Sequence, residues 1–246
     1  MAWFFRYGSH RQDGRLNGGT LHASKGEVIQ ASPFFMLDQI LSVLVVLVVV
    51  IDPVGLAPIF ASLTVGANDQ YRLKMARQGV LISAGILIVF TIAGSQLLGW
   101  LGIGLDAFRI AGGFLLFMLS IDMVFARQSG LRSTTHTEEV EAHEREDISV
   151  FPLAIPLIAG PGSMTTLVLM LRENSRPESY WIILGVLIVV LIMTYYALRF
   201  STAIMKRLGE TGANVISRLL GVLLSALAVQ YIVDGIKGSL FAASPI

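Results

Sequence analysis

Prolines and glycines gather at two places inside long apolar stretches of the chain, where backbone groups rather than side chains could bind a ligand. The first cluster reads IDPVGLAP over residues 51–58, and the second reads PLAIPLIAGPGSMTT over residues 152–166. A proline inside a helix removes one amide donor and pushes away the carbonyl four residues earlier. In lipid, backbone interrupted in this way is tolerated only where it is buried in protein or lines a cavity. Two such interruptions, in corresponding halves of a chain, are typical of the binding site of a secondary transporter.

The two clusters would offer complementary partners to a molecule that carries both charges. Carbonyl groups freed before each break can hold a cation or an ammonium group, and amides that start the following half-helix can hold a carboxylate. Ser163, Thr165 and Thr166 add hydroxyl groups just after the second break. Two antiparallel broken helices that meet at the centre of the membrane would therefore supply both kinds of partner to a zwitterion.

Asp52 is the one carboxylate that this pattern places near the membrane centre. Ionised residues at that depth are costly, so they usually face the protein interior and have a function. One interpretation makes Asp52 a site for Na⁺ or H⁺ coupling, or the partner of a substrate ammonium group. The other makes it a structural cap on amides of the broken helix, since Asp before Pro often starts a turn. Asp122 and Asp234 lie closer to span ends, where we expect them to be hydrated.

Six apolar runs are long enough to cross the roughly 30 Å of hydrocarbon in a bilayer. They lie near residues 38–62, 79–101, 106–125, 149–171, 180–200 and 215–236. The hydrophobic fraction of 54%, the charged fraction of 14% and the mean hydropathy of +0.70 are those of a membrane protein. The chain has no cysteine, and its four histidines all lie in polar segments. Apart from a coupling ion, we therefore expect no cofactor and no metal site.

An acidic segment, residues 127–147, divides the spans into three plus three. We interpret it as a solvated loop rather than a helix that binds metal through His136 and His143, because a charge run of this kind is usually hydrated. The predicted organisation is a disordered leader, a first three-helix repeat, the acidic loop, a second three-helix repeat and a tail, at residues 1–35, 36–126, 127–147, 148–238 and 239–246.

The two halves of the chain resemble each other at matching spacings. Pro53 lies 108 residues before Pro161, and the motif RIAG at residues 109–112 recurs 109 residues later as RLLG at residues 218–221. Each half has three spans, an odd number, so the second copy must enter the membrane from the opposite side. The predicted fold is an all-α membrane protein of six transmembrane helices in two inverted three-helix repeats, with helices one and four broken near mid-bilayer.

Small and amide side chains within the spans have simpler explanations than ligand binding. We expect Gly112, Gly113 and Gly221 to allow close packing of helices. Hydrogen bonds between helices explain Gln96 and Gln230 at least as well as contact with a substrate.

Lysine and arginine in short loops predict the orientation, because they are enriched on the cytoplasmic side. Leader aside, ten lie on the side of the acidic loop and four on the other side. This places both termini outside and residues 127–147 in the cytoplasm. The four basic residues of the leader conflict with the rule, and one resolution is that translation begins at Met36.

Several motifs resemble those of the MarC family of integral membrane proteins. The longest is FPLAIPLIAGPGSMTT at residues 151–166, and the others are IDPVGLAPIF at 51–60, RIAGG at 109–113 and LGETGANVISRLLGVLLSALAVQYIVDGI at 208–236. The resemblance covers roughly residues 36–238. It implies six helices in two inverted repeats, with unwound first and fourth helices that meet at the centre, and a location in the bacterial inner membrane.

The resemblance also implies a function, the transport of small neutral amino acids such as glycine and alanine by alternating access. The implied partners are the amino acid and the lipid bilayer, with no nucleic acid, and the possible coupling ions are Na⁺ and H⁺. Asp52 is the candidate for ion coupling, at a position where the family often has Asn. Carried onto this chain, the substrate site comprises Pro53, Gly55, Pro58, Gly160, Pro161, Gly162, Ser163 and Thr165.

Three other functions compete with this one. Multidrug export would favour a larger, aromatic-lined cavity than these Gly, Pro, Ser and Thr residues indicate. An intramembrane aspartyl protease would need a Gly-x-Gly-Asp motif, and GIGLD at residues 102–106 has one residue too many. Since no nucleophile elbow, metal-binding pair or P-loop is found either, we expect no enzymatic activity. A non-transporting regulatory membrane protein would carry the same spans, and the oligomeric state has no signal in the sequence.

Overall fold

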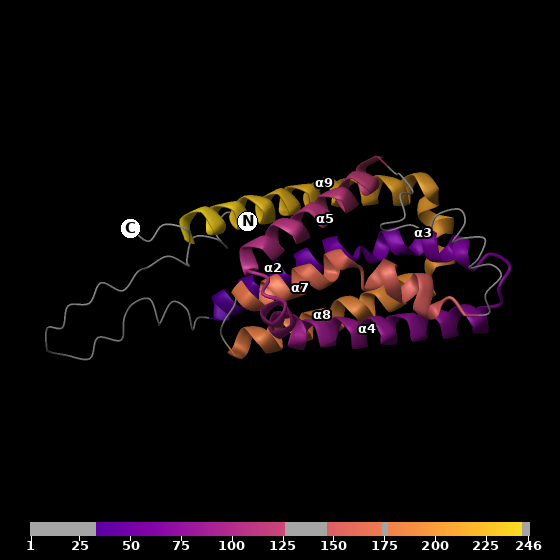
Figure 1. Cartoon of the computed structure of the whole chain (residues 1–246). Coiled ribbons are helices and arrows are strands. Elements are labelled where there is room, and N and C mark those ends of the chain that lie inside the picture. The colour runs from indigo at the N-terminus through magenta and orange to yellow at the C-terminus, as the bar shows by residue number, and fades with distance from the viewer. Residues whose placement is uncertain (1–32, 126–146, 174–176, 243–246) are drawn as a thin grey trace, which may run out of the picture. The chain divides into compact units, whose positions relative to one another are not determined.

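The computed structural model describes residues 33–125, 147–173 and 177–242 (Figure 1). The chain divides into two units, residues 1–38 and 39–246, and the helix packing lies within the second. Every regular element in the described ranges is a helix. In chain order they are α2 (Pro33–Ile51), α3 (Pro53–Leu63), α4 (Asp69–Trp100), α5 (Leu105–Phe125), the π-helix η1 (Ser149–Ile158), α7 (Pro161–Glu173), α8 (Pro177–Arg199) and α9 (Ser201–Ala242).

The expected all-α class and set of spans are confirmed by the length and apolar character of these helices. A sixth span forms if η1 and the first part of α7, Pro161–Arg172, count as one, with a bend of 51° between them. Each predicted run overlaps one of these spans, whereas the inverted relation of the two halves stays a prediction. The five single spans are Met36–Leu63, Asp69–Trp100, Leu105–Phe125, Glu178–Arg199 and Thr211–Leu240.

Some of the predicted organisation falls outside the described residues. This applies to most of the predicted leader, to the acidic loop except its last residue, and to the end of the predicted tail. The pair His136 and His143, considered above as a metal site, lies there as well.

Two helices begin earlier than their apolar runs predict. α4 begins at Asp69 rather than near residue 79, and the Asn68 side chain caps it by accepting a hydrogen bond from Tyr71 N at 2.8 Å. α9 begins at Ser201 rather than near 215, with its helical conformation interrupted at Gly209 (φ 65°, ψ 174°). Hydropathy reports only the part of a helix that suits lipid, so polar first turns are missed.

The two spans that contain proline lie between two hydrophobic clusters. In the first cluster, Leu47 of α2 and Leu167 of α7 pack with residues of α3, α4, η1 and α8. In the second, Val50 of α2 and Leu169 of α7 pack with residues of α5 and α9. Since α2 and α7 contribute to both clusters, they occupy the interior of the helix assembly.

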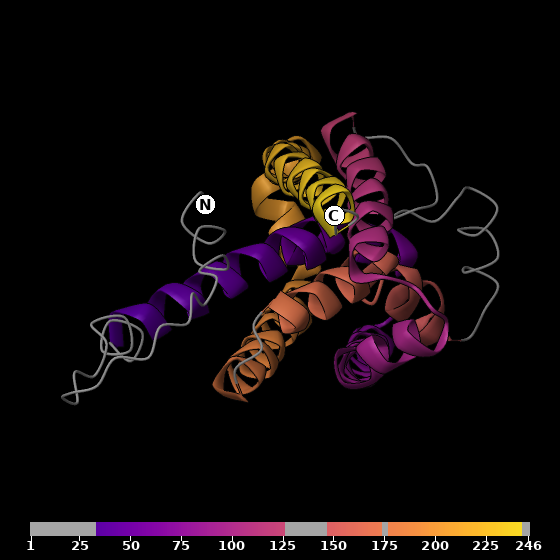
Figure 2. The same cartoon turned by 60° about the vertical axis from the view of Figure 1, so that its left-hand side comes forward.

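α5 and α9 pack side by side along much of their length (Figures 1 and 2). Glycines make this approach possible, since a Cβ on Gly113 would lie 2.8 Å from the carbonyl oxygen of Ala228. A Cβ on Gly221 would lie 2.8 Å from Met123 Cβ. Gly112 faces α7 instead, where its missing side chain leaves room for the methyl group of Thr165. The expectation that these glycines serve packing is confirmed.

Two expectations for polar residues within the spans are wrong. Gln230 donates to both carboxylate oxygens of Asp234 at 2.9 Å, and Gln96 accepts from its neighbour Ser95 at 3.0 Å, so these bonds lie within one helix. Asp122 is buried, with 9% of its surface exposed, rather than hydrated at a span end. The bond between Gln230 and Asp234 follows from helix register, because i and i+4 side chains are neighbours. Asp122 is buried because it follows Leu115 and Leu119 at helical spacing on the inward face of α5.

Just before η1, Asp147 accepts a hydrogen bond from Ser149 N at 2.8 Å. Hydrogen bonds from the Ser149 side chain and backbone lower the pKa of the Asp147 carboxyl group. A lowered pKa in the folded state stabilises the fold above the pKa of the unfolded chain. This contribution is lost as the pH falls through the folded-state value.

The α5–α9 contact predicts the outcome of a conservative substitution. Gly113→Ala should lower the free energy of unfolding by about 1–3 kcal/mol, because the new methyl group meets backbone that cannot rotate away. The matched control is Gly85→Ala in α4, where a Cβ meets nothing within 4 Å. The control should be neutral or stabilising by roughly 0.5–1 kcal/mol. Thermal unfolding of both variants in detergent checks this, and equal melting temperatures would contradict it.

Candidate functional site

The first break in the membrane-length helices is a single residue, Asp52, between α2 and α3. Its backbone is left-handed (φ 47°, ψ 70°), and it is the one non-glycine residue with positive φ in the described part of the chain. Asp52 N still donates to Val48 O at 2.8 Å, and Leu56 N donates to Asp52 O at 3.1 Å. The span is therefore interrupted briefly rather than unwound over several residues. Left-handed backbone outside glycine costs free energy and is concentrated at functional sites.

The Asp52 carboxylate is buried, with 1% of the residue exposed. Its Oδ1 accepts a hydrogen bond from Gly55 N at 3.0 Å, which confirms the structural cap as one of its roles. Oδ2 lies against Gly55, and a Cβ on Gly55 would also come within 2.8 Å of Ser217 Oγ in α9. The carboxylate and this hydroxyl thus approach each other across the glycine, and only glycine leaves space there.

The second break is longer and involves a different backbone geometry. Phe151 (φ −129°, ψ 126°) and Ile155 (φ −123°, ψ 125°) are extended within η1. Ala159 N donates to Ala154 O at 2.8 Å, five residues earlier, which closes the last turn of the π-helix. The chain then passes through Gly160 and starts α7 at Pro161. Such wide turns within helices are often found at functional sites.

Gly160 allows the backbone to fold back closely at this point. A Cβ on Gly160 would lie 2.6 Å from the carbonyl oxygen of Pro156. The hydrogen-bond ladder of α7 begins with Met164 N donating to Gly160 O at 3.1 Å. The amides of Gly162 and Ser163 come before that bond and so have no acceptor within the helix. The Ser163 hydroxyl donates to Ile158 O at 3.0 Å and ties the two half-helices together.

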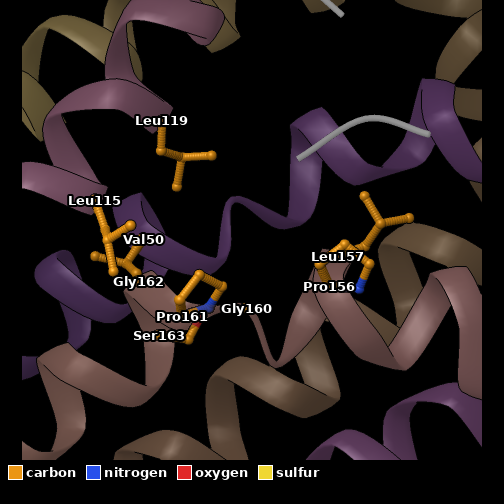
Figure 3. Close-up of a pocket in the computed structure, with 9 residues that line it drawn as sticks. All are labelled: Val50, Leu115, Leu119, Pro156, Leu157, Gly160, Pro161, Gly162 and Ser163. Atoms are coloured by element: carbon orange, nitrogen blue, oxygen red, sulfur yellow. The ribbon is translucent and has the colours of Figure 1, made fainter. Parts of the chain in front are cut away.

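A small pocket lies at the start of α7 (Figure 3). Figure 3 shows Val50 and Leu115 grouped at the Gly162 end and Pro156 and Leu157 at the other. Its free space holds about one water-sized molecule. The lining residues are Val50, Leu115, Leu119, Pro156, Leu157, Gly160, Pro161, Gly162 and Ser163.

The structure divides the predicted site residues into two groups. Gly160, Pro161, Gly162 and Ser163 line the pocket. Thr165 is buried next to it, with its methyl group against Gly112 of α5.

The α3 residues form the other group. Asp52, Pro53 and Gly55 are buried, and Gly55 approaches Ser217 of α9. Pro58 is half-buried within α3. The pocket reaches this group only through Val50, which lies two residues before Asp52.

Sequence reasoning missed the aliphatic part of the pocket wall. Leu115 and Leu119 lie one turn apart on α5, and Val50 is the residue before the last of α2. Nothing in their residue types distinguishes them from lipid-facing leucine and valine. The only available signal is register, since Leu115 and Leu119 follow Gly112 at helical spacings on the face that packs against α7.

The close backbone approach at Gly160 predicts a graded effect of added methyl groups. Gly160→Ala should destabilise the fold by about 1–3 kcal/mol, because the methyl group meets a fixed carbonyl oxygen. Gly162→Ala should cost less, because its methyl group meets the mobile end of Leu116 at 2.7 Å. Gly185→Ala in α8 meets nothing within 4 Å and serves as the control. Thermal unfolding of the three variants should rank them in this order, and a Gly160→Ala variant as stable as the control would refute the geometry.

Comparisons with known proteins agree with the interpretation of this chain as a membrane protein. The sequence profile of MarC family integral membrane proteins matches residues 37–240. A UPF0056 membrane protein of Methanocaldococcus jannaschii is 36% identical over 192 residues, covering 78% of this chain and 92% of the relative. The UPF0056 membrane protein YvbG of Bacillus subtilis is 35% identical over 203 residues, covering 82% and 96%.

A third relative adds a cellular location to its name. The UPF0056 inner membrane protein YhgN of Escherichia coli is 32% identical over 205 residues, covering 82% of this chain and 98% of the relative. No solved structure matches the chain. The match of the profile to most of the chain, together with these relatives, shows that the chain belongs to the MarC family of integral membrane proteins.

Proposed function

We propose that this chain carries small neutral amino acids, of the glycine and alanine type, across the bacterial inner membrane by alternating access. The observation that supports this most strongly is the chemical difference between the half-helices that follow the two breaks. α3 starts at a carboxylate, Asp52, whose Oδ1 already accepts from Gly55 N. α7 starts after Gly160, which has no side chain, and its first residues line the pocket.

A zwitterion fits this difference. The partial positive charge at the start of α7 attracts a carboxylate, and the amides of Gly162 and Ser163 can donate to it. The ammonium group would point towards Asp52 and the carbonyl end of α2. Val50 lines the pocket, and two peptide units span at most about 7.6 Å, so Asp52 lies within reach of a molecule held there.

The lining favours a small substrate over a drug. It consists of glycine, proline, serine, valine and leucine residues and includes no aromatic side chain. Space for about one water is too little for an amino acid, so the loaded state must be wider than the one described. Widening towards one side at a time is what alternating access between two inverted halves requires.

The remaining parts of the proposal concern coupling and orientation. Asp52 binds Na⁺ or H⁺ in addition to capping α3, because an ionisable group buried in a membrane span is costly unless it has a role. Both termini lie outside and residues 127–147 lie in the cytoplasm, as the distribution of lysine and arginine predicts.

Flux in proteoliposomes tests the proposal. The purified chain should take up radiolabelled glycine and alanine saturably, and an imposed sodium or proton gradient should accelerate uptake. Uptake no faster than in protein-free liposomes for every amino acid would refute it. A preference for large aromatic cations would indicate multidrug export, and chemical conversion of the added compound would indicate an enzyme.

Asp52→Asn separates the two roles of this residue. The amide oxygen of Asn keeps the acceptor for Gly55 N, so the variant should fold normally, but the charge that binds the ion is lost. We expect uptake that no longer responds to the ion gradient. Asp52→Ala, which removes the cap as well, should in addition lose about 1 kcal/mol of stability. If Asp52→Asn keeps the gradient response of the wild type, Asp52 is a cap and nothing more.

A further inference from the structure

One hydroxyl group in α7 is buried without a hydrogen-bond partner. Thr166 has 0% of its surface exposed, and its Oγ1 makes no hydrogen bond within the described part of the chain. Buried side-chain hydroxyls nearly always have a partner in native proteins, so each exception needs an explanation. The known contacts of α7 do not supply one, because Thr165 faces Gly112 of α5 and Val168 faces Gly94 of α4.

Four other buried hydroxyls in this chain use a partner that a helix offers. Each donates to the carbonyl oxygen four residues earlier, at 2.6–2.8 Å. For Thr166 that acceptor would be the carbonyl of Gly162, and the bond is not made. The hydroxyl is therefore kept free in a place where the helix could have used it. The four that bond in the usual way are Thr64, Ser83, Thr91 and Thr194.

Thr166 does not itself line the pocket, but it lies on the same face of α7 as Gly162, which does. Side chains in an α-helix tilt towards its N-terminus, so a residue covers the surface of the turn before it. The residue one turn before Thr166 is Gly162, which lines the pocket (Figure 3). Gly162 has no side chain that could cover Thr166. The Ser163 hydroxyl at the same end is already bonded to Ile158 O. Of the hydroxyls in this turn of α7, that of Thr166 is the one that is both fully buried and without a hydrogen bond.

We infer that Thr166 is a specificity-determining residue whose hydroxyl donates a hydrogen bond to the carboxylate of the transported amino acid. This rests on the proposed function and assigns a side-chain donor to it, beside the amides of Gly162 and Ser163. A donor in a site without water strongly rejects analogues that lack the matching acceptor. The hydroxyl therefore distinguishes amino acids from amines and amino alcohols of the same size.

Removal of the hydroxyl at constant shape tests the inference. Thr166→Val should raise the KM for alanine uptake in proteoliposomes at least tenfold, whereas Thr166→Ser, which keeps the hydroxyl, should stay within about threefold of the wild type. Thr194→Val is the matched control, because Thr194 is also fully buried but its hydroxyl bonds to Val190 O at 2.8 Å in α8. That control should transport with the wild-type KM.

Competition identifies the chemical group that Thr166 recognises. In the wild type, unlabelled alanine should compete with labelled alanine far better than alaninol, which has no carboxylate, and better than propionate, which has no ammonium group. In Thr166→Val the preference for alanine over alaninol should fall about tenfold, while the preference over propionate should not change. An unchanged preference over alaninol would overturn the inference.

Thermal stability gives a second readout that a structural role would not produce. Without ligand, Thr166→Val should melt at or above the wild-type temperature, because an unpaired buried hydroxyl has been removed at constant volume. Added alanine should raise the melting temperature of the wild type and of Thr194→Val but not that of Thr166→Val. If Thr166→Val melts at a lower temperature than the wild type and alanine still raises that temperature, the hydroxyl has a structural role and the inference is overturned.

The outcomes separate this inference from the proposed function. If the wild type neither transports nor binds any amino acid, both fail together. If the wild type transports alanine and Thr166→Val does so with the same KM, only the role of Thr166 fails. Should Thr166→Val not fold, Thr166→Ala removes the same hydroxyl, and its KM decides the question in the same way.

Discussion

Proline has no amide hydrogen, and in this chain that fact constrains the position of two whole spans. Pro53 and Pro161 begin half-helices, and Pro58 and Pro156 lie inside helices, within stretches apolar enough to cross a membrane. Carbonyl groups that lose their donor in lipid must be covered by protein. The burial agrees with this requirement, because 56% of the Met36–Leu63 window is buried against 28–39% for the other four single spans.

The two halves meet this constraint with different chemistry. In the first half a side chain satisfies the free backbone amide, since Asp52 is left-handed and its carboxylate accepts a hydrogen bond from Gly55 N. In the second half the backbone forms the bond itself, because Ala159 N donates to Ala154 O in a π-helical turn. Gly160 follows this turn, and any other residue there would clash with the carbonyl oxygen of Pro156. The start of α3 is thereby occupied by the carboxyl group of Asp52, and the start of α7 is left available.

The sequence predicted those features that depend on long runs or on rigid residue types. Apolar length located the spans, and Gly112, Gly113 and Gly221 were correctly expected to allow close packing of helices. Features that depend on the direction of a single side chain were not predictable. The Ser163 hydroxyl is used within the backbone, and Asp122 is buried although it lies near a span end.

The pocket wall shows the same limit. Leu115 and Leu119 have the same residue type as leucines that face lipid, so only the three-dimensional register distinguishes them. Asp52 lies between these cases, because its residue type predicted a cap or an ion site and the structure confirms the cap.

The membership of α2 and α7 in both hydrophobic clusters has a mechanical consequence. In α2, Leu47 belongs to the first cluster and Val50, three residues later, to the second. In α7, Leu167 belongs to the first cluster and Leu169 to the second. A rigid-body movement of either cluster would therefore twist both α2 and α7. The twist is absorbed where the helices are interrupted, at the left-handed Asp52 and at the wide turn before Pro161. Lateral pressure from the surrounding lipid would therefore change the backbone at those two places.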